Sequence, residues 1–247
     1  LIEQQQISWL NCAPSAFYPL QDEPCQWRQL DSLRLLFLGG EPINLPRLEP
    51  WLRHGRCQLI NSYGPTECAD IAAWYAVDLQ RDLATATLPI GRPNDNVKLY
   101  VLGEQLELLP LGAVGELCIG GDGVGPGYLN NPEQTRDRFV ANPHIPGETL
   151  YRTGDRVRYR ADGNLEYLGR QDHQIKLRGY RVEAAEIQAV INQQPAVRES
   201  LVDVVSDSQG VSRLVAWVVT EAPEAPPESA TVEACRQRLP GFMVPEQ

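Results

Sequence analysis

Apolar runs and helical spacing alternate through the first third of the chain. Residues 7–13 (I-S-W-L-N-C-A), 33–38 (L-R-L-L-F-L) and 57–60 (C-Q-L-I) predict short buried strands. Between the second and third runs, apolar residues recur at helical spacing, which predicts a helix. Its apolar positions are Leu45, Leu48, Trp51 and Leu52. Strands that alternate with helices indicate an α/β fold of packed layers, in which loops at strand ends form the ligand sites.

From about residue 88 onward, the pattern changes to β structure. Residues 97–102 and 116–119 predict strands. Asn131-Pro132-Glu133 predicts the start of a helix, because Asn is a good cap and Pro suits the first helical position. Farther along, two turn signals, T-G-D at 153–155 and A-D-G-N at 161–164, separate short β-rich runs.

The last part of the chain predicts a small α+β unit. Residues 183–192 predict a helix, and residues 201–205 and 214–219 predict strands. Residues 222–229 (A-P-E-A-P-P-E-S) predict an exposed loop. Residues 231–239 predict an amphipathic helix with three apolar side chains on one side: Val232, Cys235 and Leu239. We place the domain boundary between a portion 1–170 and a portion 171–247.

Composition and charge narrow the function classes. With 43% hydrophobic and 22% charged residues, the 247-residue chain resembles an ordinary soluble globular protein. Its formal net charge of −10 argues against a nucleic-acid partner, because such a partner attracts a basic face. No apolar run approaches the ~20 residues that span a bilayer, and no signal-peptide pattern is present, so we expect no membrane partner.

Cysteines and histidines give no sign of a disulfide framework or a metal site. The six cysteines are scattered without a C-x-x-C pair, which argues against both and fits a reducing cytoplasm. His54, His144 and His173 share no metal-ligand spacing, so we expect them at the surface.

Residues 151–186 combine turns with charged side chains. Each β-rich run here places a charged residue beside a turn, where a strand end holds it towards a ligand. Structural hairpins show the same pattern, so these residues alone leave a hairpin and a ligand site equally open. The polar chain that follows Gly169 suits a crossing between two domains.

Four motifs in order carry a family resemblance. They are N-S-Y-G-P-T-E at 61–67, G-E-L-C-I-G-G-D-G-V-G-P-G-Y-L at 115–129, Y-R-T-G-D with G-R-Q-D-H-Q-I-K-L-R-G-Y-R-V-E at 151–155 and 169–183, and L-P-G-F-M-V-P at 239–245. Together they resemble the amino-acid-activating (adenylation) domains of nonribosomal peptide synthetases. The resemblance implies the C-terminal part of the large adenylate-forming domain, with α/β layers and a small β-rich subdomain, followed by a small mobile α+β domain.

The resemblance implies ATP-dependent formation of an aminoacyl-adenylate. A carboxylate then attacks the α-phosphate of ATP, so the site needs fixed donors, cations and Mg²⁺. In residues 61–67, Gly64 and Pro65 force a tight turn that exposes backbone N–H groups. Thr66 offers a hydroxyl to a phosphate oxygen, and Glu67 is a hard carboxylate of the kind Mg²⁺ prefers. A helix-capping turn with Thr66 as the cap is the structural alternative.

Further nucleotide contacts follow from the resemblance. It places Asn61, Ser62 and Tyr63 on the adenine side of the site. Gly39-Gly40-Glu41 ends a strand with two residues that lack Cβ, so a flat ring can approach the backbone closely. A plain turn is the alternative reading for these glycines, and the resemblance favours a role on the adenine and substrate side.

The late motifs supply the ribose side of the implied site. Asp155 is the carboxylate expected to accept both ribose hydroxyls. Tyr167 is expected near the nucleotide, with buried tyrosine packing as its alternative, and Arg170 is expected at the ribose or phosphate. Asp172 resembles the hinge about which the small domain swings between adenylation and thiol transfer. The implied partners are an amino acid, the phosphopantetheine of a peptidyl carrier protein and a neighbouring condensation domain.

Matching the motifs also places a substrate pocket. Its wall would comprise Asn11, Phe37, Gly39, Ser62, Asp70 and Ile71. We expect Asp70 to be a buried carboxylate in need of a partner, which a cationic or hydrogen-bonding substrate side chain would supply. An exposed helical Asp near a cap is the alternative.

The sequence also departs from the family pattern. It contains no Ser/Thr/Gly-rich phosphate loop ending in Lys-Gly, no matching Asp for the substrate's α-amino group, and no catalytic Lys after the residue 239–245 motif. Gly125-Pro126 replaces the family's common Ala-Arg pair. We therefore expect a fragment of an adenylation domain that is inactive by itself.

Two other readings stay open. An acyl-CoA or aryl-acid ligase has the same fold, although the Y-G-P-T-E sequence at 63–67 and the residue 169–181 motif favour a peptide synthetase. A non-catalytic structural remnant is the second, and the retained chemistry-bearing residues Thr66, Glu67, Asp155 and Arg170 weigh against it.

Overall fold

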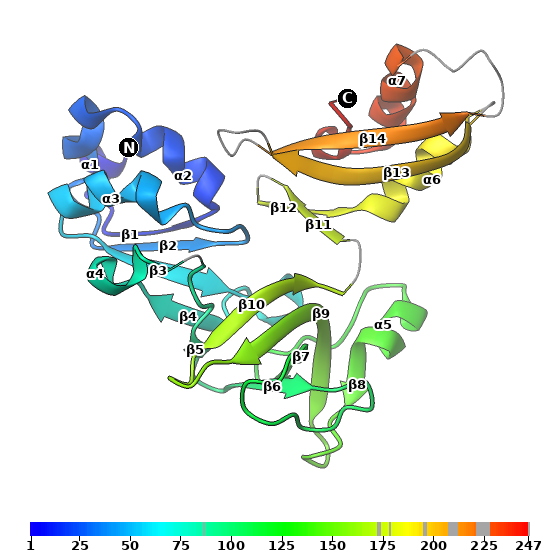
Figure 1. The fold of residues 1–247 in the computed structure, drawn as a ribbon, viewed down its shortest axis with the longest axis horizontal. Helices are drawn as coiled ribbons and strands as arrows, with labels where there is room; N and C mark the ends of the chain where they lie inside the picture. The colour runs from blue at the N-terminus through cyan, green and yellow to red at the C-terminus, as the bar shows by residue number, and fades with distance from the viewer. Residues whose placement is uncertain are drawn as a thin grey trace. The chain divides into compact units, whose positions relative to one another are not determined.

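The computed structural model divides the chain into two compact units. The N-terminal unit is Leu1–Gln171 and the C-terminal unit is Asp172–Gln247, one residue beyond the boundary expected from the sequence (Figure 1). The structure describes residues 1–85, 87–171, 174–177, 179–194, 197–206, 212–220 and 228–246. The expected hinge residue Asp172 and His173 lie outside the described residues.

The first sheet of the N-terminal unit has the order β1-β2-β3-β4-β5. Neighbours among β1, β2 and β3 pair in parallel, and β3–β4 and β4–β5 are antiparallel. The strands are β1 (Trp9–Cys12), β2 (Leu35–Gly39), β3 (Gln58–Tyr63), β4 (Ala73–Ala76) and β5 (Arg92–Pro93). The helices are α1 (Ile2–Gln5), α2 (Pro14–Gln21), η1 (Pro24–Leu30), α3 (Leu45–His54), η2 (Thr66–Cys68) and α4 (Leu79–Asp82). The three predicted strands and the predicted helix are confirmed.

One face of this sheet forms the first core. Leu36, Leu38 and Leu59 point to the same side of adjacent strands and share a buried cluster with Leu48 and Trp51 of α3. Figure 1 shows α2 and α3 on one side of the parallel strands. Burying an aliphatic side chain of this size contributes about 1.5–3 kcal/mol to folding stability. Because the apolar residues of α3 recur at helical spacing, they lie on one face of the helix, and their burial holds α3 against the sheet.

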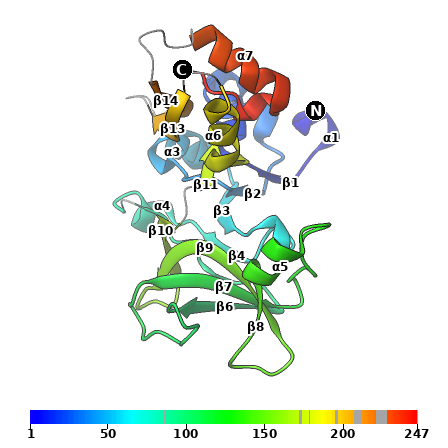
Figure 2. The same ribbon diagram turned by 90° about the vertical axis from the view of Figure 1, so that its right-hand side faces the viewer.

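The second sheet is antiparallel and forms the β-rich part of the unit (Figure 2). Its order is β10-β9-β7-β6, with β8 on β9. The elements are β6 (Val97–Leu102), β7 (Gly115–Gly121), α5 (Pro132–Arg138), β8 (Phe139–Ala141), β9 (Thr149–Tyr159) and β10 (Leu165–Arg170). Both predicted strands are present. The helix start is also confirmed, because Asn131 caps α5 by accepting a hydrogen bond from the Gln134 N–H at 3.1 Å.

A second core joins the two sheets within the N-terminal unit. Tyr63 and Ala73 of the first sheet share a buried cluster with Leu117, Tyr151 and Leu165 of the second. The residue 61–67 motif and the residue 151–155 motif are therefore held against one hydrophobic core, although about ninety residues separate them in sequence.

The C-terminal unit is the expected α+β arrangement. Its elements are β11 (Gln174–Leu177), β12 (Tyr180–Glu183), α6 (Ala184–Asn192), β13 (Val197–Ser206), β14 (Ser212–Thr220), α7 (Glu228–Arg238) and η3 (Gly241–Met243). β11 pairs with β12 and β13 with β14, both antiparallel. Ile187, Val202, Leu214 and Cys235 form its buried core.

The division between the two units falls in the polar stretch after Gly169, where a crossing was expected. The β11–β12 pair that follows was not predicted; its Ile175 and Val182 lie opposite each other and are buried. One prediction for this unit needs correction. The expected loop 222–229 ends in a helix, since Glu228 and Ser229 begin α7; residues 222–227 lie outside the described residues. Cys235 and Leu239 are buried as predicted, whereas Val232 is half-buried.

The histidines were expected at the surface. His54 and His144 are exposed, as predicted. Within the described part of the chain, none of the helices has the length and apolar content needed to cross a bilayer.

Candidate functional site

Four of the predicted pocket residues lie on one face of the parallel strands. Register places Asn11 opposite Phe37, and Gly39 opposite Ser62. Because alternate side chains of a strand share a face, these four side-chain positions point to the same side of the sheet, opposite to the α3-covered core. The Phe37 ring lies 5.7 Å from that of Trp9, which is on the same face. The structure thus places these four positions on one face of the sheet, and their role as a pocket wall stays a prediction.

Asp70 joins this group, but not as a buried carboxylate. Its carboxylate accepts a hydrogen bond from the Asn11 carboxamide at 3.1 Å. Asp70 is exposed and lies in a bend next to Ala69, the C-cap of η2. The buried reading is therefore wrong, and the alternative is right about exposure and the nearby cap but wrong about the helix. The physical reason is local: Ala69 and Asp70 adopt successive left-handed conformations (φ 58° and 70°), which turn the chain outward after η2. Half-buried Ile71 follows directly.

The glycines at the end of β2 have structural reasons of their own. A Cβ at Gly39 would lie 2.6 Å from the Ser62 Oγ and 2.8 Å from its carbonyl oxygen. Gly40 has a φ of +82°, with no atom near the position of an added Cβ. Close strand packing and a turn therefore explain both residues. The Glu41 carboxylate accepts a hydrogen bond from the Ser15 N–H at 3.0 Å.

The loop after β3 is closed tightly at its base. The Ala72 N–H donates to the Tyr63 carbonyl at 2.9 Å, and a Cβ at Gly64 would lie 2.0 Å from the Asp70 carbonyl oxygen. Glycine is required at position 64 by this close approach. Thr66 is exposed and begins η2, whose cap position is Pro65, so the alternative with Thr66 as the cap is wrong.

Asn61 and Ser62 point to opposite faces of β3. Asn61 is 8% exposed, and its amide donates to the Pro89 carbonyl at 2.8 Å. That bond ties β3 to the segment that leads into β5.

A buried cluster surrounds Asp155. Its carboxylate, 3% exposed, accepts hydrogen bonds from the Tyr63 hydroxyl at 2.5 Å and from Arg170 at 2.8 Å. Arg170 also donates to the Thr153 carbonyl at 3.0 Å. Burial, reinforced by the Asp155 charge, raises the pKa of Tyr63 well above its usual value, so the phenol stays a donor. The half-buried Tyr167 packs beside the cluster, its ring centroid 6.5 Å from that of Tyr63.

This cluster changes what is expected of Asp155. Each of its two carboxylate oxygens already accepts a bond from a protein donor. A carboxylate oxygen has two lone pairs, so ribose hydroxyls would add to these bonds or displace Tyr63.

Glu67 is anchored by a residue that the sequence did not single out. Its carboxylate accepts a hydrogen bond from the Tyr128 hydroxyl at 2.6 Å, and its main-chain carbonyl accepts one from the Gly125 N–H at 2.8 Å. Tyr128 and Gly125 both belong to the glycine-dense motif at 115–129, which was expected to shape the fold. The motif does so by holding a predicted site residue.

The arrangement around Glu67 fits the implied magnesium ion. Proteins usually hold Mg²⁺ with one or two carboxylates together with substrate phosphates. Among the described residues, no group of three or more His, Cys, Asp or Glu side chains gathers to hold a metal ion. One anchored carboxylate therefore fits an ion shared with phosphates, and not an ion caged by the protein.

Glu116 is a second residue that the sequence analysis missed. Buried at 5% exposure, its carboxylate accepts hydrogen bonds from the Gly154 N–H at 3.1 Å and from Arg152 at 2.6 Å. It thereby holds the part of β9 that carries Asp155. The turn predicted at residues 153–155 is wrong, because these residues lie inside β9, where Gly154 has a φ of 74°. An acidic residue inside the apolar run of β7 was the signal, because a buried charge requires a partner.

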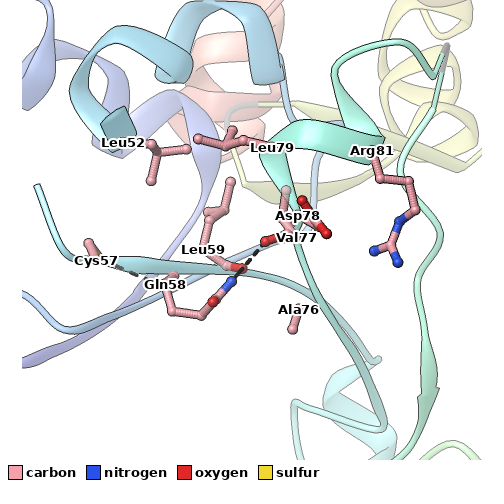
Figure 3. Close-up of a pocket in the computed structure, with 9 residues that line it drawn as sticks. All are labelled: Leu52, Cys57, Gln58, Leu59, Ala76, Val77, Asp78, Leu79 and Arg81. Carbon is pink, nitrogen blue, oxygen red and sulfur yellow. Dashed lines mark hydrogen bonds between the residues drawn. The ribbon is translucent and has the colours of Figure 1, made fainter. Parts of the chain in front are cut away.

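A pocket of about 500 Å³ lies at the opposite end of β3 from the motif loop (Figure 3). Its apolar lining includes Leu52, Leu59 and Leu79. Polar side chains that line it form hydrogen bonds or ion pairs with other protein groups. Gln58 donates to the Leu59 and Val77 carbonyls, and Arg81 pairs with Asp82. This pocket brings none of the predicted site residues together.

Fold and site together define a class. A partly parallel α/β sheet with loops at its strand ends, a β-rich subdomain and a small α+β unit is the organisation of the C-terminal part of an adenylate-forming enzyme. Residues 1–129, more than half of the chain, match the family described as AMP-binding enzyme. The chain belongs to this AMP-binding enzyme family.

Relatives of known name agree with this assignment. The chain is 41% identical over 245 residues to tyrocidine synthase 3 of Brevibacillus parabrevis, covering 99% of the chain and 4% of that protein. A solved artificially fused adenylation-PCP di-domain from Klebsiella oxytoca is 28% identical with a TM-score of 0.80, covering 99% of this chain and 48% of that one. The Vibrio cholerae adenylation domain AlmE, in complex with glycyl-adenosine-5'-phosphate, is 29% identical with a TM-score of 0.82 and coverages of 99% and 47%. The chain thus spans about half of these solved chains.

Proposed function

We propose that the chain is part of an amino-acid-activating domain of a nonribosomal peptide synthetase. The parent domain joins an amino acid to ATP as an aminoacyl-adenylate and then transfers it to the phosphopantetheine thiol of a carrier protein. The observation that carries this proposal is the bond between Tyr63 and Asp155. It connects the residue 61–67 loop, suited to phosphates, with the buried carboxylate suited to a ribose, so one nucleotide can contact both.

Each residue then has a defined role. The backbone N–H groups around Gly64 and the exposed Thr66 hydroxyl bind phosphate oxygens, and Gly39-Gly40-Glu41, Asn61, Ser62 and Tyr63 line the adenine side. Asp155 accepts the ribose hydroxyls, with Tyr167 and Arg170 beside the nucleotide. Glu67 holds Mg²⁺. When bound, Mg²⁺ would neutralise charge on the phosphates. Fixed donors in a partly buried site stabilise developing charge without reorganising at the moment of reaction.

The pocket wall supports a polar amino-acid substrate. Asn11 and Asp70 are hydrogen-bonded to each other on the exposed side of the sheet, near the face that carries Phe37 and Ser62. We propose that a hydrogen-bonding or cationic substrate side chain contacts this pair. Asp70→Ala would then shift the preference towards aliphatic amino acids in ATP–pyrophosphate exchange. An unchanged preference would refute this assignment.

The C-terminal unit would act as a mobile lid, with Asp172 as its hinge. A carrier-protein partner is supported by the adenylation-PCP di-domain among the solved relatives. We propose a neighbouring condensation domain on the motif resemblance alone. We expect the parent protein in the cytoplasm.

In the full-length protein, Asp172→Pro fixes φ and should slow the swing of the C-terminal unit between the adenylation state and the thiol-transfer state. Normal rates for both half-reactions would remove the hinge role.

ATP–pyrophosphate exchange by the full-length protein tests the main proposal. Exchange with amino acids and not with fatty or aryl acids is the expected result. Exchange driven by fatty or aryl acids would favour an acyl-CoA or aryl-acid ligase, and no exchange with any acid would favour a structural remnant. The 247 residues alone should show no exchange, because they contain no Ser/Thr/Gly-rich loop ending in Lys-Gly.

A further inference from the structure

The hydroxyl of Tyr128 makes a short hydrogen bond to Glu67. The donor and acceptor oxygens are 2.6 Å apart, within the range of charge-assisted O–H to carboxylate bonds. These residues lie 61 positions apart in sequence and belong to different motifs. The bond fixes one carboxylate oxygen and therefore limits the orientations that the carboxylate can adopt.

Tyr128 is itself held on several sides. Its N–H donates to the Thr135 hydroxyl at 2.9 Å, and Thr135 donates to the Asn131 carbonyl at the start of α5 at 2.8 Å. Its ring meets the Phe139 ring edge-on, with centroids 5.4 Å apart. The Tyr151 hydroxyl lies 3.3 Å from the Tyr128 hydroxyl. A donor restrained by main chain, ring packing and a second hydroxyl has little freedom to move with a side chain that it binds.

The main chain gives Glu67 a second, independent restraint. The Gly125 N–H donates to the Glu67 carbonyl, and a Cβ at Gly125 would lie 3.2 Å from that oxygen. Gly123 approaches the next residue of η2, since its added Cβ would lie 3.4 Å from the Cys68 carbonyl. The glycine-dense segment therefore runs closely beside η2. Backbone and side chain of Glu67 are both fixed from this one segment.

We propose that Tyr128 is a positioning residue that sets the Glu67 carboxylate for a divalent cation. This inference rests on the proposed function, in which Glu67 is the metal ligand. Partners that orient a ligating carboxylate typically affect metal affinity by about 10–100-fold. A neutral phenol suits the role, because it fixes the carboxylate orientation while leaving the negative charge for the cation.

The hydroxyl can be separated from the packing of the ring. Tyr128→Phe keeps the edge-on contact with Phe139 and removes only the donor. Tyr159→Phe is a matched control, because Tyr159 packs against the same hydrophobic cluster and donates its hydroxyl to the Leu99 carbonyl at 2.9 Å instead of to Glu67. Both changes delete one tyrosine hydroxyl from the same core.

The test is the equilibrium affinity for Mn²⁺, used as a paramagnetic probe for the magnesium site. Free and bound Mn²⁺ are measured by electron paramagnetic resonance on the full-length protein loaded with a non-hydrolysable ATP analogue. We expect Tyr128→Phe to raise the Mn²⁺ dissociation constant about tenfold, and Tyr159→Phe to leave it within about twofold. Tyr151→Phe, which removes the hydroxyl that touches Tyr128, should give a smaller change in the same direction. It serves as the test variant if Tyr128→Phe does not fold.

Glu67→Gln separates a failure of this inference from a failure of the proposed function. If Glu67→Gln weakens Mn²⁺ binding while Tyr128→Phe and Tyr151→Phe do not, the positioning role is wrong and the metal ligand stands. If Glu67→Gln leaves the affinity unchanged, the metal role of Glu67 is wrong, and this inference falls with it. Support requires that Tyr128→Phe weaken binding in the wild-type background and add nothing in the Glu67→Gln background.

Discussion

Two aspartates in the N-terminal unit occupy opposite environments. Asp155 is 3% exposed, accepts bonds from Tyr63 and Arg170, and lies in β9 next to Gly154, whose N–H donates to Glu116. Asp70 is exposed, bonds to Asn11 at 3.1 Å, and sits on an outward bend. The first environment is rigid and the second adaptable. The proposed nucleotide would suit the former, and the proposed amino-acid substrate would suit the latter.

The same contrast appears in how each region is built. The Asp155 cluster joins two sheets through a shared hydrophobic core, so any change there disturbs packing as well as charge. The Asn11 and Asp70 pair lies on the sheet face away from the α3-covered core, where a hydrogen bond can be exchanged for one to water. Stability and substrate preference should therefore respond to different residues.

The largest expected effect is the loss of stability in Asp155→Ala. It takes the counter-charge away from an Arg170 side chain that is 10% exposed, and breaking a buried ion pair costs about 3–5 kcal/mol. The measurement is denaturant unfolding of the full-length protein. Asp155→Asn retains the shape but also removes the charge, so it separates the loss of charge from the loss of volume. A loss below about 1 kcal/mol in Asp155→Ala would show that the cluster is not the rigid region.

Tyr63→Phe should cost about 1.5–3 kcal/mol at neutral pH, because it removes a hydrogen bond to a buried carboxylate. Its pH dependence has a defined sign. The folded-state pKa of Tyr63 is raised above the ordinary value of 10.0, so its stabilisation is fully present below that pH and is lost as pH rises towards the folded pKa. The stability difference between wild type and Tyr63→Phe should shrink above about pH 10. A difference that grows with alkaline pH would contradict the assignment.

Gly39→Ala should cost about 1–3 kcal/mol through overpacking, because the new methyl group would meet Ser62 main-chain and side-chain atoms. Gly40→Ala is the neighbouring control: it meets no atom, and carries only the cost of a left-handed residue, about 1–2 kcal/mol. Substrate affinity should fall in Gly39→Ala, since Ser62 lies in the proposed pocket. If both variants were equally stable with equal substrate affinity, close strand packing would not define the pocket wall.

The smallest expected effect on stability is that of Asn11→Ala. Asn11 is half-buried and donates to an exposed carboxylate, so we expect a loss of less than about 1 kcal/mol in thermal unfolding. Its effect on amino-acid preference in pyrophosphate exchange should be several-fold. A stability loss as large as that of Asp155→Ala would erase the contrast between the two regions.

Local patterns were sufficient for the regular elements. Residues 97–102 form the predicted strand, and the Asn131-Pro132-Glu133 start of α5 follows from capping and proline chemistry within a few residues. The β11–β12 pair was missed because its apolar positions, such as Ile175 and Val182, are few within a polar stretch. Local sequence carries little signal for a strand pair of that kind.

The sequence predicted which residues belong to the candidate site, but it did not predict which of them contact one another. Motifs pointed to Glu67, Asp155 and Arg170, whereas Tyr128, the partner of Glu67, comes from a segment that only the folded core brings close. The prediction that Asp70 is buried was wrong because its exposure depends on two residues with left-handed backbone conformations, which hydrophobic periodicity does not reveal. From the sequence, Tyr128 is expected only to shape the fold. Its role depends on the folded position of its hydroxyl beside Glu67, which the sequence pattern does not give.

The proposal that a rigid nucleotide region is combined with an adaptable substrate region is tested most directly by ATP–pyrophosphate exchange of the full-length Asp70→Ala variant over a panel of amino acids. The expected result is a changed ranking of the amino acids with the KM for ATP unchanged, because the proposed nucleotide contacts at Tyr63 and Asp155 are intact. An unchanged ranking with a raised KM for ATP, or no exchange by the wild-type protein with any amino acid, would contradict it.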